Sequence, residues 1–380
     1  MGIKNLHNLL RKICPRVYNT VPLTKYAFKK IAIDLSLFMC KYKTSYGIHW
    51  LDGFLQMITV LRHNDIHFVV VYDSKAPPEK DNERKQRSEA RAKNRIRVDK
   101  IQEAWETYRQ HHPDKEVVLL EDFREEDELL YTFLQKFMEG HEDGLNPTKI
   151  ENELVRMQQS LLSIRPEDFE LTKELFRICG IPIHIAKGEA EASCSSLNVQ
   201  GFVSAVLTED TDVLAYSTPI MLCKIDFQTN TCIELDYQEI LTELKLTSSE
   251  FLDLCIMCGT DYNTNLPKVG CDKSFKLIQQ YRSLEAMERE LPHHNYEILN
   301  YRRVRELFLQ PLEFDPHAVP FCDFPNQSQL YEFCFTHNCR VDLDTIIKAC
   351  CTSQFHEFEF ERDEDQKREN KKNLLLFHNK

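Results

Sequence analysis

Short apolar runs, several of them closed by an acidic residue, recur along this chain. Their length and their content of β-branched residues predict buried strands at residues 28–34, 66–73, 181–186 and 202–208. Apolar positions with helical spacing predict helices at residues 51–63, 99–111, 127–139 and 168–179. Strands that alternate with helices indicate an α/β fold with a mostly parallel central sheet flanked by helices.

Other parts of the chain depart from this alternation. Residues 111–167 show no strong strand signal and mix acidic stretches with loop-forming residues, which indicates an insertion. Residues 248–281 predict two helices around a turn at 259–270, and helical patterns continue through 283–350. The tail from Glu357 is highly charged, so we expect it to be partly disordered.

The composition is that of an ordinary globular protein, with 42% hydrophobic and 28% charged residues among 380. No window approaches 18 consecutive apolar residues, and the first residues lack the apolar region of a signal peptide. We therefore expect a protein of the nucleus or cytoplasm that is neither secreted nor held in a membrane. Its 14 cysteines are then expected to be reduced thiols.

Cysteine spacing offers two candidate zinc sites, and we expect packing at both. Cys255 and Cys258 have ligand spacing but lie in an apolar helical run without a second pair. Cys334, His337 and Cys339, with Cys322 nearby, lie among phenylalanines.

Positive charge is concentrated in one stretch of an acidic chain. The net charge is −12, yet residues 80–100 hold nine Lys or Arg and four Asp or Glu. Basic side chains that share one face of the predicted helix are Lys80, Arg84, Arg87, Arg91 and Arg95. Such a run is usually a solvated face. Because this one follows directly after a strand that ends in an acid, we expect it to bind a polyanion.

Acidic residues follow three of the four predicted strands. In parallel sheets the carboxyl ends of neighbouring strands share one edge, where ligands bind. A single acid is usually a helix cap or a solvated charge, but gathered carboxylates repel one another and require cations. The candidate metal ligands are Asp34, Asp73, Glu189, Glu191, Asp210, Asp212 and Asp261. We expect Glu189 and Glu191 at the start of a helix, since residues two apart diverge in mid-helix. This oxygen-only set suits two Mg²⁺ ions roughly 3.5–4 Å apart, and Mn²⁺ can substitute.

The acidic blocks occur in an order that resembles the flap endonuclease/XPG family of structure-specific 5′ nucleases. The matching blocks are MGIKNLHNLL, IAIDLS, VVYDSKAPPEK, KGEAEASC, LTEDTDVLAY and LCIMCGTDY. The resemblance implies that the seven acids bind metal and that the chain hydrolyses DNA phosphodiesters near single-strand/double-strand junctions. Branched or 5′-flapped DNA is the implied partner. Lys80 and Arg87 would be catalytic, on a helix beside the metals, and Gly2 would lie near the active site and help to hold DNA.

The turn at 259–270 resembles the family's helix–two-turn–helix, which holds duplex DNA with a bound potassium ion. Lys268, Gly270 and Lys273 are the implied phosphate contacts, together with Arg84 and Arg91 from the basic face. Where the family prefers Gly-Ile-Gly or Gly-Val-Gly, this chain has Lys268-Val269-Gly270, which weakens the case for K⁺.

Three further departures concern the family's other features. Asp34 and Asp73 are 39 positions apart, shorter than in cellular flap endonucleases, and the missing length falls where the family builds its pocket for a 3′ flap nucleotide. Glu189 follows Asp73 by 116 positions, which leaves room for the 111–167 insertion. No clamp-binding box is recognisable in the tail, so we do not expect a sliding-clamp partner. Compact family members also occur in large DNA viruses, and these departures fit such a member.

Together these patterns predict a monomeric Mg²⁺-dependent endonuclease or 5′ exonuclease of DNA replication, repair or recombination. Its expected regions are an N-terminal nuclease region at 1–110, the insertion at 111–167, an internal nuclease region with the helix–two-turn–helix at 168–281, a helical part at 282–356 and the tail at 357–380. Two alternatives stay open: a non-catalytic nucleic-acid-binding or scaffold protein on a nuclease-derived fold, and a two-metal phosphatase of small molecules.

Overall fold

The computed structural model describes residues 2–123, 128–137, 144–314 and 319–351. The chain forms two compact units. We call them the sheet unit, made of Met1–Met39, Leu51–Lys80 and Arg165–Lys380, and the helical unit, made of Cys40–Trp50 and Asp81–Ile164. The tail expected to be disordered from Glu357 lies outside the described residues. Within those residues, no helix is both long enough and apolar enough to cross a membrane.

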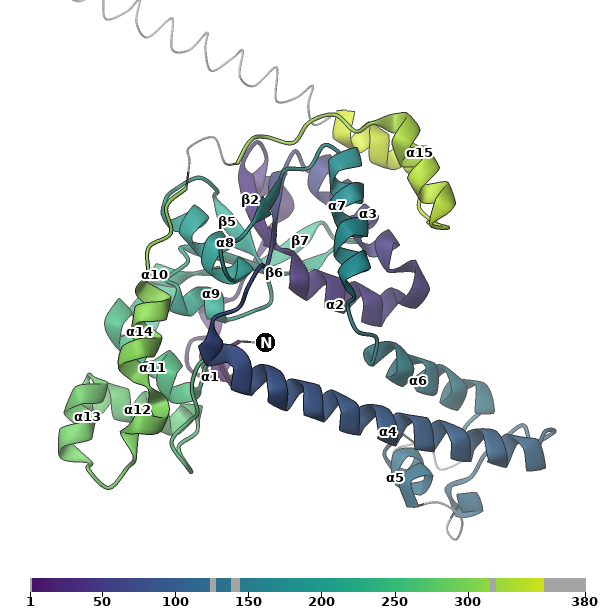
Figure 1. Cartoon of the computed structure of the whole chain (residues 1–380), viewed down its shortest axis with the longest axis horizontal. Coiled ribbons are helices and arrows are strands. Elements are labelled where there is room, and N and C mark those ends of the chain that lie inside the picture. Colours follow the sequence, from purple (N-terminus) through teal and green to yellow (C-terminus); the bar gives the residue numbers. More distant parts are fainter. Residues whose placement is uncertain (1, 124–127, 138–143, 315–318, 352–380) are drawn as a thin grey trace, which may run out of the picture. The chain divides into compact units, whose positions relative to one another are not determined.

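One seven-stranded sheet organises the sheet unit, in the order β1-β7-β6-β5-β2-β3-β4 (Figure 1). The strands are β1 (Asn19–Pro22), β2 (Lys30–Asp34), β3 (His67–Tyr72), β4 (Ile183–Ile185), β5 (Ala205–Leu207), β6 (Ile220–Asp226) and β7 (Thr231–Asp236). The five strands from β6 to β4 pair in parallel, whereas β1 and β6 pair with β7 antiparallel. The predicted α/β class with a mostly parallel sheet is confirmed.

All four predicted strands occur, as β2, β3, β4 and β5. β2 and β3 are two residues shorter than their apolar runs, whereas β4 and β5 keep only three residues each. Three further strands, β1, β6 and β7, were not predicted. They are partly exposed and carry polar residues between the apolar ones. The apolar runs therefore identified four of the five parallel strands and missed β6 and the antiparallel strands β7 and β1. The expectation that 181–186 forms a buried strand is wrong, because β4 lies at the edge of the sheet and is partly exposed.

Helices cover both faces of the sheet. On one face, α8 (Ala190–Val199) packs on β2, β3 and β5. Its apolar side chains join Ala32 and Val69 in a core that includes α11 (Ser248–Cys258). On the other face, α3 (Trp50–His63) meets α7 (Pro166–Ile178), where the rings of Phe54 and Phe176 are 5.6 Å apart.

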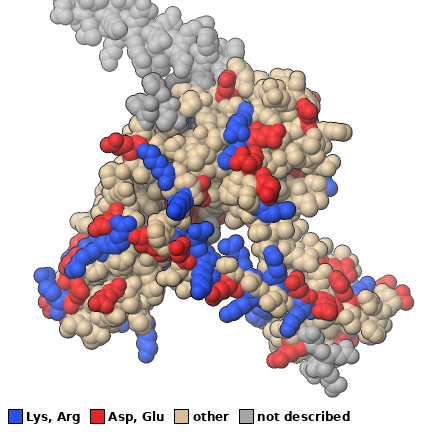
Figure 2. Space-filling model, in the orientation of Figure 1, with Lys and Arg blue, Asp and Glu red and all other residues tan. Residues whose placement is uncertain are grey.

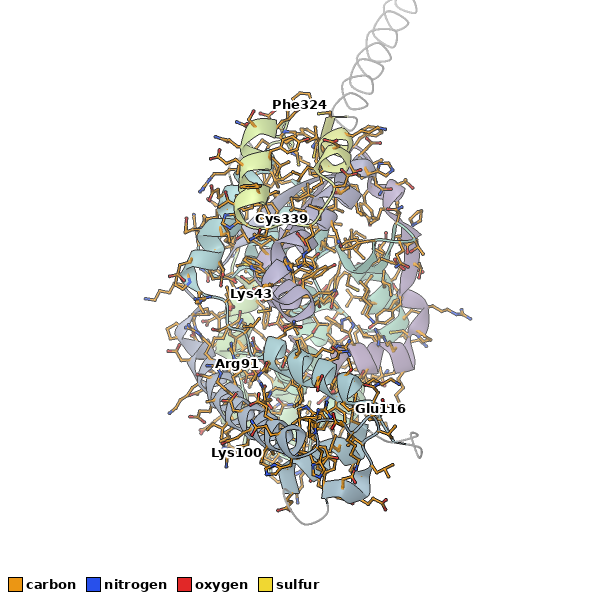
Figure 3. All side chains as sticks on the ribbon, turned by 90° about the vertical axis from the view of Figure 1, so that its right-hand side faces the viewer. Lys43, Arg91, Lys100, Glu116, Phe324 and Cys339 are labelled. Carbon is orange, nitrogen blue, oxygen red and sulfur yellow. The ribbon has the colours of Figure 1, made fainter. Side chains whose placement is uncertain are left out.

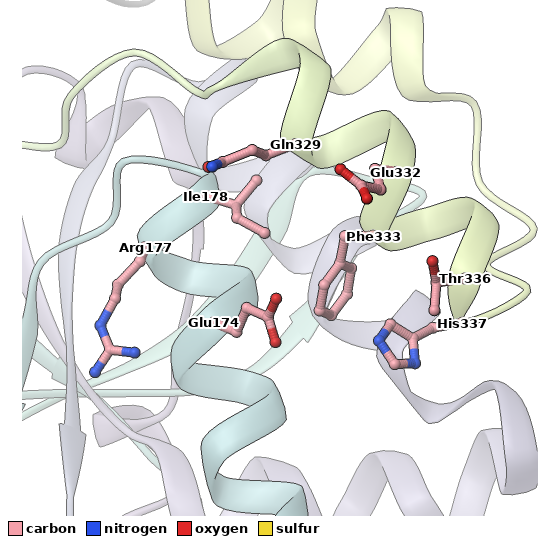
Figure 4. A pocket seen from close by; sticks show the side chains of 8 residues that line it. All are labelled: Glu174, Arg177, Ile178, Gln329, Glu332, Phe333, Thr336 and His337. Carbon is pink, nitrogen blue, oxygen red and sulfur yellow. The ribbon is translucent and has the colours of Figure 1, made fainter.

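Further helices complete the sheet unit. They are α1 (Leu6–Ile13), α9 (Asp212–Ala215), α10 (Tyr237–Leu244), α12 (Cys271–Tyr281), α13 (Leu284–Glu290), α14 (Tyr301–Leu309) and α15 (Gln327–Thr336); α2 (Leu35–Tyr46) begins in this unit and continues into the other. The helix α15 packs on α7. Figure 4 shows the cleft between them, where Phe333 and His337 of the α15 segment face Glu174 of α7.

The helical unit is built on α4 (Asp81–His111), one helix of 31 residues. Its second half buries Ile101, Trp105 and Tyr108 against α5 (Glu128–Phe137) and α6 (Pro147–Ser160). The helix predicted at 99–111 is therefore the end of a longer helix. Figure 3 shows Arg91 and Lys100 along it.

The segment 111–167 contains, among its described residues, helices and one isolated bridge between Val118 and Leu145. Its apolar residues form a core of their own with the end of α4. The region boundaries expected from the sequence stay a prediction.

Candidate metal centre and nucleic-acid interface

Three neighbouring parallel strands, β5, β2 and β3, end at the same edge of the sheet. Asp34 is the last residue of β2, and Asp73 follows β3 directly. Asp210 lies three positions after Leu207, the end of β5. The strands thus bring the three aspartates to one edge, as the sequence predicts. Because β2 lies between β5 and β3, Asp34 lies between Asp210 and Asp73.

Hydrogen bonds hold the first two aspartates in place. Thr208 Oγ1 donates to Asp34 Oδ2 over 3.0 Å. Asp73 accepts at both oxygens, from Ser36 Oγ at 2.5 Å and from the backbone N–H of Ala190 at 2.7 Å. The side chain of Asp34 is therefore bound to the strand next to its own, and that of Asp73 to the start of α8.

The start of α8 supplies two glutamates. Glu189 is the N-cap residue with extended backbone, and Glu191 lies in the first helical turn. The chain is still irregular at Gly188, just before the helix. The Gly188 carbonyl accepts a hydrogen bond from the Ser74 N–H over 2.9 Å. The expectation that this pair lies at a helix start is confirmed.

The tight turn from Asp210 to Asp212 completes the edge. The Asp212 N–H donates to Asp210 Oδ1 over 2.9 Å, and Asp212 begins α9. Gly2 lies against this turn with φ +78°. A Cβ at this position would come within 2.8 Å of the Thr211 nitrogen and 2.7 Å of the Asp212 nitrogen. A side chain at position 2 would therefore collide with the acidic turn.

Lys80 is buried among these acids. It ends a short 3₁₀ turn, Pro78–Lys80, and its Nζ is bonded to Glu189 and lies 3.2 Å from Asp261 Oδ2. Tyr262 donates its hydroxyl to the other oxygen of Glu189. The ammonium group thus neutralises part of the cluster, and its predicted contact with the scissile phosphate stays a prediction.

The electrostatics follow from burial and crowding. Burial, with the carboxylates of Asp73 and Asp210, raises the pKa of Asp34 to about 8. Burial is also the main cause that raises the pKa values of Glu191, Asp210 and Asp212.

The pKa of Lys80 shifts toward the charged form. Burial alone would lower it, but Glu191, Glu189 and Asp261 raise it above the usual lysine range. The carboxylates around Lys80 therefore favour further positive charge besides that of its one ammonium group.

The donor set fits a hard divalent cation. All seven acids offer oxygen ligands, which Mg²⁺ prefers. Asp212 Oδ1 is buried and accepts no hydrogen bond from the described residues. As the side chains stand, no three Asp, Glu, His or Cys residues of the described ranges are arranged to hold an ion. Lys80 lies between two of the acids, so a cation at this edge requires local rearrangement.

The basic stripe lies on the first half of α4, in the helical unit. Arg87 pairs with Glu83 at 2.9 Å and Arg84 with Asp81 at 3.8 Å, both on the same helix. No residue from 81 to 97 is buried. Figure 2 shows Lys and Arg side chains gathered over this half of the helix. Arg84, Arg91 and Arg95 are exposed to solvent, and Arg87 is half-buried. The prediction that Lys80 shares their helix face is wrong, because Lys80 precedes α4 in a 3₁₀ turn and is buried among the acids.

The predicted helix–turn–helix is formed by α11 and α12. Lys268 and Lys273 are exposed, and neither makes an ion pair or hydrogen bond with a described residue. Gly270 is the N-cap of α12 and exposed. Lys268 has φ +60°, a left-handed conformation that favours glycine. The position at which the family prefers glycine thus keeps a backbone suited to glycine, although it holds lysine.

Four of the five cysteine candidates for zinc are buried in the core, and Cys339 is half-buried. Cys255 and Cys258 are buried in α11. Cys322 packs its thiol against the backbone of Phe68, and Cys334 is buried on α15.

Two supporting residues were missed in the sequence. Thr208 and Tyr262 bond directly to Asp34 and Glu189. Their positions carried a signal, because Thr208 is the last residue of a predicted strand and Tyr262 follows a predicted ligand.

Comparison with known proteins gives a consistent result. The XPG N-terminal domain matches residues 1–94, and the XPG I-region matches residues 180–261. A probable RAD2-like endonuclease, 076L of Invertebrate iridescent virus 3, is 32% identical and covers 92% of this chain and 97% of its own length. Flap endonuclease 1 of Glossina morsitans morsitans is 27% identical and covers 88% and 81%.

Solved structures share the fold. The catalytic core of Rad2 in complex with DNA substrate superimposes with a TM-score of 0.62 at 18% identity, over 93% of this chain and all of that one. Flap endonuclease-1 from Methanococcus jannaschii gives 0.54 at 19% identity, over 90% and 97%. With the family models and the viral relative, these likenesses show that the chain belongs to the flap endonuclease/XPG family of structure-specific nucleases, which act on DNA.

Proposed function

We propose that this protein cuts DNA at 5′ flaps or 5′ ends near single-strand/double-strand junctions, with Mg²⁺ held by the seven clustered acids. The observation that carries the proposal is the buried, unbonded oxygen of Asp212 at an edge where three strands deliver carboxylates. Leaving such a group without a partner is costly unless a cation satisfies it.

The chain's own residues would divide the work. Asp34, Asp210 and Asp212 offer buried oxygens, whereas Asp73 is exposed at the rim. Two divalent ions bound there would supply an activated water and stabilise the leaving oxygen. Lys80, once released from Glu189, would be close enough to the cluster to donate to the phosphate being cut. Arg87 on α4 is the second proposed donor.

DNA would be recognised by its shape and backbone. The arginines of the exposed half of α4 suit a polyanion. Lys268, Gly270 and Lys273 offer phosphate contacts at the start of α12, where backbone N–H groups also point outward. Gly2, which lies against the acidic turn, would help to hold DNA near the active site. Such contacts would fix the position of the protein along the DNA without recognising its base sequence.

Several finer statements belong to the same proposal. We infer a monomer of the nucleus or cytoplasm that works in DNA replication, repair or recombination without a sliding clamp. Mn²⁺ would replace Mg²⁺. The short segment between Asp34 and Asp73 would leave little discrimination for a one-nucleotide 3′ flap.

The test is cleavage of labelled flap, nicked, bubble and four-way-junction DNAs with Mg²⁺, Mn²⁺, Ca²⁺ or excess chelator. We expect cutting of flapped DNA with Mg²⁺ or Mn²⁺ and none with Ca²⁺ or chelator. Binding without cutting under every condition would favour the non-catalytic alternative. Full activity in chelator would exclude the metal mechanism.

A further inference from the structure

A cavity of about 310 Å³ lies beside Glu189, within the sheet unit. Its lining includes Lys75, Lys187, Tyr216, Tyr262, Leu307 and Leu312. We propose that this cavity binds one nucleotide unit, a phosphate with its sugar and base, next to the carboxylate cluster. The proposal rests on the proposed nuclease function and adds a subsite to it.

The two lysines give the cavity its charge. Lys75 and Lys187 are both exposed, and neither forms an ion pair or hydrogen bond with a described residue. This separates them from Lys80, whose charge is used by the acids. Because both lysines line the cavity and carry positive charge, they favour an anion bound there.

The lysines are tied to the acids by the backbone. Lys75 follows Asp73 by two positions, and Lys187 precedes Glu189 by two. The same two segments are joined where Ser74 donates its N–H to the Gly188 carbonyl over 2.9 Å. A phosphate at the lysines would therefore be a near neighbour of a phosphate at the acids, as consecutive nucleotides of one strand are.

The rest of the lining suits a sugar and base. Tyr216 and Tyr262 join their hydroxyls at 2.9 Å, and both rings pack on Phe308 of α14, with centroids 4.7 and 5.3 Å away. Leu307 and Leu312 add apolar surface. Through the Tyr262 hydroxyl, this wall also contacts Glu189.

A nucleotide explains these features together. The volume lies at the lower end of the range of roughly 300–1,000 Å³ for small-ligand pockets. An inorganic anion would use only the lysines, whereas the sugar and base of a nucleotide would also cover the partly exposed side chains of Leu307 and Leu312. The nucleotide could belong to the bound strand or be a released 5′-mononucleotide, and the experiment separates these sources.

The experiment measures binding with Ca²⁺, so it does not depend on catalysis. Flap DNAs carry one neutral methylphosphonate linkage, moved one position at a time along the strand to be cut. Dissociation constants are measured for the wild type, Lys75→Ala, Lys187→Ala and the double variant. Lys29→Ala is the matched control, since Lys29 is exposed and precedes β2 at the opposite edge of the sheet. A second arm titrates dTMP.

For the wild type and the control, we expect one linkage near the junction at which neutralisation weakens binding about threefold to tenfold. In the double variant, neutralising that linkage should no longer weaken binding. If the profile is flat but dTMP binds the wild type and not the double variant, the cavity takes a released nucleotide. If the double variant keeps both the wild-type profile and wild-type dTMP binding, the proposal is overturned. Failure of the wild type to cut unmodified flaps with Mg²⁺ would instead refute the proposed function.

Discussion

At the scale of single residues, one lysine forms ion pairs with two of the carboxylates at the acidic edge of the sheet. Lys80 contacts Glu189 and Asp261, while Asp212 keeps a buried oxygen without a hydrogen-bond partner among the described residues. Charges buried in this way are tolerated when they serve a function. We propose separate roles for the two kinds of residue, metal binding for the acids and phosphate binding for the lysine.

Replacing one buried acid should abolish cutting and preserve binding. We expect Asp34→Ala and Asp212→Ala to lower single-turnover cleavage of flapped DNA by at least about 10³-fold, because each removes oxygen ligands from the metals. DNA affinity should stay equal or rise, since a negative charge near phosphates is lost. Glu243→Ala, an exposed acid on α10, is the control. Near wild-type cleavage in either variant would contradict the metal-site assignment.

The two proposed phosphate donors should act on the chemical step. Lys80→Ala and Arg87→Ala are expected to slow single-turnover cleavage at saturating enzyme by about 10²–10³-fold, the usual cost of losing such a donor. Affinity for DNA should change much less. Arg97→Ala, further along the exposed half of α4, controls for simple loss of charge. Normal rates in both variants would show that the stripe only attracts DNA.

Six of the seven acids could be located from the sequence, because each stands at the end of a buried strand or at a helix start. Asp261 follows the end of α11 and carries no such signal. The orientation of the acids' neighbours could not be predicted. The pairing of Lys80 with Glu189 depends on how two segments 109 positions apart fold together. The bond from Tyr262 to Glu189 likewise spans 73 positions, and no local pattern encodes it.

At the scale of elements, the α11–α12 pair shows a local conflict between backbone and side chain. Lys268 adopts a left-handed conformation that costs a non-glycine residue roughly 1–2 kcal/mol. Such strain is expected where a side chain serves binding. We therefore propose that the exposed ammonium groups of Lys268 and Lys273 contact the DNA duplex away from the cut.

Removing either lysine should therefore weaken binding and leave the chemistry intact. For Lys268→Ala and Lys273→Ala, we expect the slope of log affinity against log salt to fall by about one unit each. Single-turnover rates at saturating enzyme should match the wild type. Lys268→Gly separates strain from charge, because it should weaken binding like Lys268→Ala without loss of thermal stability. An unchanged salt slope in all three variants would remove this turn from the DNA interface.

The strands also show that sequence patterns predict buried elements and miss those that depend on pairing with neighbours. Central strands such as β3 are buried at every position, and continuous apolar runs reveal them. The hairpin of β6 and β7 has a register shift between Cys223 and Asp226 and exposes part of its length. Its stability comes from pairing with neighbours, which sequence periodicity does not describe.

At the scale of the whole molecule, the crowded acids link stability to pH and to metal. The pKa of Asp34 is raised to about 8. Between the ordinary carboxylate range and pH 8, the folded protein therefore keeps a proton on Asp34 that the unfolded chain has already released. The unfolded state binds fewer protons there, so stability falls as pH rises through this window. Glu191, Asp210 and Asp212 shift in the same direction.

Mg²⁺ should reverse this loss, because a cation stabilises the deprotonated acids. We expect Mg²⁺ to raise the melting temperature by at least about 2 °C at pH 8, and by less at pH 5. Thermal unfolding with chelator or Mg²⁺ at both pH values measures the effect, and Asp34→Ala should reduce it. An equal shift at both pH values would separate metal binding from these carboxyl groups.

The first half of α4 has a consequence for the behaviour of the free protein. From 81 to 97 no side chain is buried, so this helical stretch depends on local pairs such as Arg87 with Glu83. Isolated helices of this length are marginal in water. Its amides should exchange with deuterium sooner than those near Ile101 and Trp105, which are packed in a core. DNA phosphates bound along the arginines would slow the local unfolding of this stretch. Amide exchange from 81 to 97 would therefore report the fraction of protein molecules that are bound to DNA.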